Sequence, residues 1–137
     1  MRSIDDKAVR DEARRRSTIA DVYLGGVSVI SVSGELDCAD SSGNRVAGYA
    51  FGGKRVIIVA GVNKLVRSPE EAIQRTRMAA TEEAIRLDRH PQRLPDGICR
   101  NYECYPPVRQ CGKLLIIEKD NDPDRLSLVL VEDILGF

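Results

Sequence analysis

The chain of 137 residues is long enough for one domain with a modest core. Its 21 basic and 21 acidic side chains balance, which argues against a nucleic-acid binder held by bulk charge. No apolar run approaches the roughly 18 residues that cross a membrane. The charged N-terminal segment also lacks the apolar core of a secretion signal, so we expect a single domain, 1–137, in the cytoplasm.

The first part of the sequence predicts one helix followed by two strands. Residues 4–16 carry a thin apolar stripe among charges, which is typical of a surface helix. Residues 20–24 and 27–32 are short runs rich in β-branched residues, separated by two glycines, and each is expected to form a strand. A Ser-Gly turn follows, and it places Glu35 and Asp40 in a loop.

A second helix is expected over residues 41–51. The Ser41, Ser42 and Asn44 side chains can accept hydrogen bonds from free N–H groups at its start, and a pair of glycines favours its end. The longest apolar run, residues 56–60, comes next. A continuous run of this length predicts a strand that is buried on both faces, as in a parallel sheet.

Residues 68–88 carry the clearest local signal, that of a capped helix. Ser68 suits the N-cap, Pro69 suits the first helical position, and Glu71 completes a capping box. Four apolar side chains share one face at helical spacing, and we expect that face to pack on a sheet. They are Ile73, Ala80, Ala84 and Leu87.

The last part of the sequence predicts a long loop and two strands. Residues 91–112 show no periodicity and hold four of the six prolines, which indicates a loop. Residues 113–118 and 126–131 predict strands, and the Asp-rich turn between them favours a hairpin. The order of elements along the chain indicates an α/β layered domain.

Polar residues follow the predicted buried strand and also surround the start of the second helix. In open α/β sheets, ligands bind beyond the carboxyl ends of strands, and a helix start favours an anion. We therefore expect both groups to line one site for an anion, with acidic side chains as acid, base or hydroxyl ligand. The candidate residues are Glu35, Asp40, Gly43, Asn44, Arg45, Gly61, Asn63 and Lys64.

A purely structural interpretation of the same residues stays open. Asn44 would then only cap the helix, and Arg45 would pair with a surface carboxylate. Asn63 and Lys64 would form a solvated turn. Short signals of this kind do not separate the two interpretations.

The cysteines offer a second candidate site. Cys99, Cys104 and Cys111 fall within one stretch after His90, which in a reducing compartment indicates a metal or redox site rather than disulfides. Their spacing departs from that of common zinc and iron–sulfur sites, so free thiols packed in a loop are the alternative. His90 is the only histidine and no phosphate-binding glycine motif is present, so we assign no catalytic residue and no cofactor.

The stretch GELDCADSSGNRVAGYAFGGKRVIIVAGVNKLV resembles the central segment of the lactate-utilization (LUD) domain family. In that family a GEL turn, GNRVA, a GxKKVIVVAG-like strand and NK follow in this order. The later PPVRQC and VLVEDILGF are similar to the family's SPxRIC and VLVGEDLGF. The resemblance covers residues 20–137, and it places Glu35, Gly43–Arg45, Gly61 and Asn63–Lys64 at matching motif positions.

The resemblance implies a Rossmann-like layered sheet similar to that of the ribose-phosphate isomerase and CoA-transferase group. It also implies an accessory role in the oxidation of lactate or a related hydroxy acid, beside an iron–sulfur partner protein. A metal or redox module, or an assembly subunit without chemistry of its own, remains the alternative. The family's late CxxC pair is only partly matched, because Asn101 stands at its first place while Cys104 and Cys111 match.

Family domains are longer, so the resemblance further implies a domain that is shortened at its N-terminus. A sheet that lacks strands has an unpaired edge and uncovered apolar surface. We therefore expect the chain to associate with itself as a dimer or larger assembly.

Overall fold

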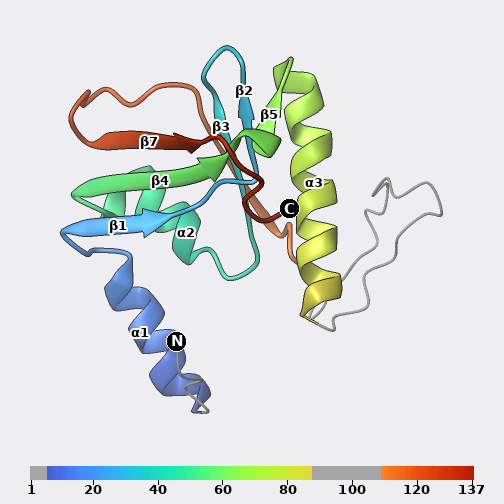
Figure 1. Cartoon of the computed structure of the whole chain (residues 1–137). Helices are drawn as coiled ribbons and strands as arrows, with labels where there is room; N and C mark the ends of the chain where they lie inside the picture. The colour runs from blue at the N-terminus through green and yellow to red at the C-terminus, as the bar shows by residue number, and fades with distance from the viewer. Residues whose placement is uncertain (1–5, 88–108) are drawn as a thin grey trace.

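The computed structural model describes residues 6–87 and 109–137 of the chain. Two sheets and the helices form layers, with the long helix on one side of the molecule (Figure 1). This arrangement confirms the α/β, Rossmann-like class predicted from the sequence. No helix in the described part of the chain is long and apolar enough to cross a membrane.

The first sheet holds three parallel strands in the order β1-β4-β7. They are β1 (Val22–Gly25), β4 (Arg55–Gly61) and β7 (Leu126–Val131). The predicted central strand is confirmed, but only alternate side chains of its apolar run, Val56 and Ile58 among them, are fully buried. Burial on both faces was the wrong expectation, because the hydrophobic core lies against one face of this sheet.

The second sheet is mixed and has the order β5-β2-β3-β6. Its strands are β5 (Leu65–Val66), β2 (Val29–Ser31), β3 (Leu36–Asp40) and β6 (Lys113–Ile117). β2 runs parallel to β5 and antiparallel to β3, which is also antiparallel to β6. The predicted hairpin is therefore wrong: β6 pairs with β3, whereas β7 pairs with β4 in the other sheet.

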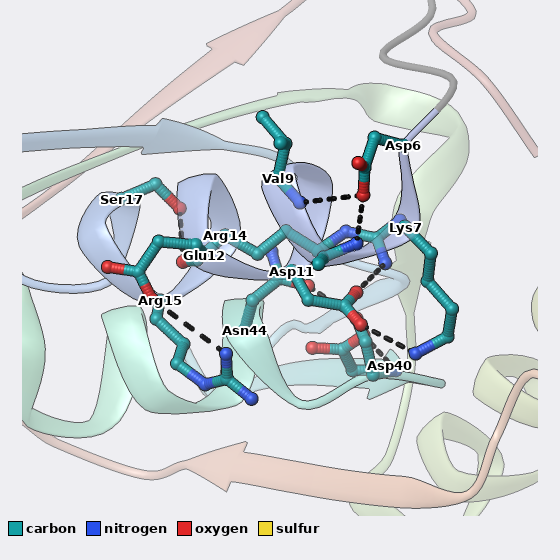
Figure 2. Close-up of polar contacts among 12 residues, drawn as sticks. Asp6, Lys7, Val9, Asp11, Glu12, Arg14, Arg15, Ser17, Asp40 and Asn44 are labelled. Carbon is teal, nitrogen blue, oxygen red and sulfur yellow. Dashed lines mark hydrogen bonds and ion pairs between the residues drawn. The ribbon is translucent and has the colours of Figure 1, made fainter.

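The first two helices meet near the parallel sheet. In α1 (Lys7–Ser17) the Asp6 carboxylate accepts hydrogen bonds from the backbone N–H groups of Ala8 and Val9 (Figure 2). None of its residues is buried, and it contacts α2 (Asn44–Ala47). The predicted helix over 41–51 is thus present as α2 and a π-helical turn, Gly48–Gly52.

The third helix, α3 (Pro69–Arg86), begins as predicted. The Ser68 hydroxyl accepts a hydrogen bond from the Glu71 N–H at 3.3 Å, and Pro69 occupies the first turn. The Glu71 carboxylate accepts from the Arg67 N–H at 3.1 Å, one residue earlier than a capping box requires.

α3 packs on the mixed sheet through small side chains rather than through its large apolar ones. Ala72 is buried with Val29 and Val66 in a cluster between this helix and the sheet. Of the four side chains predicted to pack on a sheet, Ala80 and Ala84 are buried, whereas Ile73 and Leu87 are 37% and 45% exposed, so the prediction is confirmed for the alanines and wrong for the two large side chains. Alanines let the helix approach the sheet closely, and the larger side chains then lie at the edge of the helix–sheet interface.

Two tyrosines join the helical turn to the core. Tyr49 lies in the π-helical turn, is 1% exposed, and meets Tyr23 edge-to-face with ring centroids 5.4 Å apart. Its hydroxyl donates to the Gly26 carbonyl at 2.8 Å. The Arg125 guanidinium donates to the Tyr49 carbonyl at 2.7 Å and to the Gly53 carbonyl at 3.1 Å, which ties β7 to the end of this turn.

Self-association of the chain stays a prediction, and the outer face of the parallel sheet is where we expect it. Leu24 on β1 is 67% exposed and Val129 on the edge strand β7 is 46% exposed. The strand register places both on the face of Ile57 and Val59. Exposed apolar surface on a sheet with unpaired edge strands favours contact with a second copy of the chain.

If the chain forms the expected dimer or larger assembly through this face, Leu24→Lys should shift it towards monomer, because the substitution places a charge there. Light scattering at micromolar concentration measures the mass. Ile19→Lys is the control, because Ile19 is 71% exposed and lies outside the sheets. A wild-type protein that is monomeric under these conditions would contradict the expectation.

Candidate functional site

Lys64 is a nearly buried cation at the carboxyl end of the central strand. It stands on a 3₁₀ turn, Val62–Lys64, directly after β4, and is only 9% exposed. Burial lowers the pKa of its ammonium group, and the nearby charges of Arg75 and Arg45 lower that pKa further, against an opposing effect of Glu83. A cation whose pKa is depressed by other cations lies in a positive potential, which stabilises a bound anion.

Arg45 is positioned by a buried carboxylate at the start of α2. One oxygen of Asp40 accepts hydrogen bonds from the Arg45 N–H at 2.8 Å and the Val46 N–H at 3.4 Å, and the other accepts from the Ser42 N–H at 3.2 Å. The Arg45 guanidinium donates to the Ala39 carbonyl at 2.9 Å. Asp40 is thus the last residue of β3 rather than a loop residue, and it takes the capping role predicted for serine and asparagine.

A cavity of about 520 Å³ brings Arg45 and Lys64 together. Arg86 of α3 adds a cation, and Glu83 adds a carboxylate that is paired with Arg86 at 2.6 Å. Among the side chains of the described lining residues, three cations therefore face one carboxylate. A cavity of this size and charge suits a small anionic molecule.

Asn44 and Gly43 line a different hollow, of about 460 Å³, beside α1. Figure 2 shows Asn44 beneath this helix, near Arg15. Its side chain accepts a hydrogen bond from the Ser42 hydroxyl at 2.5 Å and donates to the Tyr23 hydroxyl at 3.3 Å. Consecutive helical side chains point about 100° apart, so α2 directs Arg45 and Asn44 into separate spaces.

Glu35, Gly61 and Asn63 hold backbone segments in place. The Glu35 carboxylate accepts hydrogen bonds from the hydroxyls of Ser31 and Ser33 in the turn between β2 and β3, and these bonds lower its pKa. The side chain of Asn63 and the bare Cα of Gly61 contact residues 133–137. These three residues are absent from the described lining of the 520 Å³ cavity.

The predicted cysteine site falls almost wholly outside the part of the chain that the structure describes. Cys99, Cys104 and His90 lie outside it, and Cys111 is a half-buried free thiol. Cys38 is 1% exposed on β3, and burial raises its pKa to about 11, which makes it a poor nucleophile. Within residues 6–87 and 109–137, no group of three or more His, Cys, Asp or Glu side chains is arranged to hold a metal ion.

The sequence interpretation missed two parts of the cavity wall. Glu83 and Arg86 form an ion pair three residues apart on α3, a spacing that is common on exposed helix faces and carries no sign of a site. Residues 135–137 also line the cavity. Their sequence signal is the VLVEDILGF motif, which carries the family resemblance but contains no pattern typical of a binding site.

Comparison with known proteins gave a match to one family model, whereas neither the curated proteins nor the solved structures gave a match. The family model described as the LUD domain matches residues 2–131, which is most of the chain. The chain therefore belongs to the LUD-domain family.

Proposed function

We propose that this LUD domain binds a small anionic metabolite, a hydroxy acid such as lactate, in the cavity of Arg45 and Lys64. The protein would take an accessory role in the oxidation of that acid, together with an iron–sulfur partner protein. The lactate link comes from the name and resemblance of the family. The anion is supported by one observation: a lysine that is only 9% exposed shares its cavity with two arginines.

A buried ammonium group is energetically unfavourable unless it is paired, and Glu83, the one carboxylate side chain in the described cavity lining, is already paired with Arg86; this favours an anionic ligand. The Lys64 ammonium group donates a hydrogen bond to the main-chain oxygen of Phe137, the last residue of the sequence, at 2.5 Å. The Arg45 guanidinium donates to the neutral carbonyl of Ala39. A carboxylate bound between the two side chains would give each of them a charge-assisted hydrogen bond, which is shorter and stronger than one to a neutral acceptor.

Lys64→Met is expected to weaken binding of L-lactate about tenfold or more, because it removes a charge-assisted hydrogen bond worth about 1.5–3 kcal/mol. Methionine keeps most of the volume, and loss of an uncompensated buried charge need not destabilise the fold. Calorimetric titration measures the affinity, and thermal unfolding checks the fold. Lys119→Met, at an exposed position before β7, is the matched control and should bind as the wild type does.

The same titrations carry a second readout in their pH dependence. A bound anion favours the protonated form of Lys64, so it raises the depressed pKa and binding takes up protons. Affinity should therefore fall as the pH rises towards the pKa of this lysine. A folded wild-type protein without binding at millimolar lactate, or Lys64→Met with wild-type affinity, would refute the proposal.

A further inference from the structure

The last five residues of the sequence, 133–137, cross the end of the central strand as a strap. Figure 1 shows this dark red segment leaving β7 and turning back to end beside α3. It has no regular secondary structure, and residues 135–137 line the cavity of Arg45 and Lys64. The strap therefore lies next to the proposed ligand site.

Two side chains from the turn after β4 hold the strap. The Asn63 side-chain oxygen accepts a hydrogen bond from the Leu135 N–H at 3.1 Å. The Lys64 ammonium group donates to the Phe137 main-chain oxygen at 2.5 Å. Adjacent residues of one turn thus bind the strap at two points, and the second point is the cation on which the proposed anion depends.

Two glycines allow the strap to approach this closely. A Cβ atom on Gly61 would lie 2.3 Å from the Asp133 carbonyl oxygen and 2.6 Å from the Leu135 nitrogen, both of them backbone atoms. Gly136 has a φ of 67°, a left-handed conformation that glycine adopts without strain. Because Gly61 and Gly136 have no side chains, the backbone of the strap can pack directly against the end of β4.

The strap is held more weakly than the strands beside it. Ile134 is 73% exposed, and Leu135 and Phe137 are each 37% exposed, so its apolar side chains bury only part of their surface. Segments with few buried apolar contacts open at low free-energy cost. The two hydrogen bonds to Asn63 and Lys64 are then a substantial part of what keeps it closed.

We propose that the strap regulates the anion site by competing for Lys64. With the strap closed, the Phe137 main-chain oxygen holds one donor of the ammonium group and residues 135–137 line the cavity, so an anion competes with the strap for Lys64. Binding is therefore coupled to opening of the strap, and anything that weakens the closed state raises the apparent affinity. This inference rests on the proposed function, because it concerns the same cavity.

Asn63→Ala tests the strap, because it removes the acceptor for the Leu135 N–H and leaves Lys64 in place. The variant is expected to bind L-lactate and inorganic phosphate about threefold to tenfold more tightly than the wild type, the factor that follows from losing one hydrogen bond. Asn121→Ala, at an exposed turn position, is the matched control and should leave the affinity unchanged. Gly61→Ala disturbs the contact between the strap and β4, so it should also raise the affinity for both anions. Thermal unfolding checks that this variant is folded.

Hydrogen exchange at the Leu135 amide reports on the strap directly. Exchange should be faster in Asn63→Ala than in the wild type, and in the wild type it should become faster when lactate or phosphate is bound. Equal or weaker anion affinity in Asn63→Ala would overturn the strap proposal while the proposed function stands. Absence of anion binding in the folded wild type would overturn the proposed function and the strap proposal together, because the strap would then have no anion to compete with.

Discussion

Ile58→Ala is expected to lower the free energy of unfolding by about 3 kcal/mol, the largest effect of any single change considered for this chain. Ile58 is fully buried at the centre of β4, in the cluster that joins the parallel sheet to the mixed sheet. Truncation there removes apolar contact area and leaves a void that close-packed neighbours fill only in part. Urea unfolding at equilibrium measures the loss, provided that the slope of the transition is unchanged.

Ile57→Ala is the matched control, because Ile57 is the neighbour of Ile58 on the same strand and faces the other side of the sheet. It is half-buried, so about 1 kcal/mol is expected. The difference between the two variants measures how far the core lies on one face of β4. Equal losses at low protein concentration would show that the outer face is as well packed as the inner one, and would contradict this description of the sheet.

The central strand could be predicted because its signal is local and strong. An uninterrupted apolar run from Val56 to Ala60 has few structural alternatives, and β4 forms there. The start of α3 was equally predictable, since Ser68 and Pro69 act within one turn. What the run did not reveal is its one-sided burial, because burial depends on which other elements cover each face.

The pairing of the last two strands could not be predicted from neighbouring residues. An Asp-rich turn between two apolar runs is typical of a hairpin, yet β7 pairs in parallel with β4, and β6 pairs with β3. Such partners lie far away in the sequence, and no local pattern encodes them. β3 itself was hidden by its buried Asp37 and Asp40, which interrupt the apolar pattern of a strand that is buried throughout.

The candidate site was predictable to the level of elements but not of side chains. The rule that ligands lie beyond the carboxyl ends of strands led to the turn after β4 and the start of α2, and the structure brings Lys64 and Arg45 to one cavity there. The same rule could not tell which side chains of these two segments point inwards. That depends on the rotation of α2, which Asp40 sets by accepting the Arg45 and Val46 N–H groups.

Asp40→Ala is accordingly expected to lower the free energy of unfolding by about 2 kcal/mol. The Asp40 carboxylate is only 4% exposed, and its removal leaves the N–H groups at the start of α2 without acceptors. It should also weaken anion binding, since the turn that carries Arg45 loses its anchor. Asp40→Asn keeps one acceptor oxygen and should lose about half as much stability, whereas Asp122→Ala, in an exposed turn, should change it by less than about 0.5 kcal/mol. Urea unfolding and lactate titration measure the two effects, and an Asp40→Ala protein as stable as Asp122→Ala would show that another group satisfies the helix start.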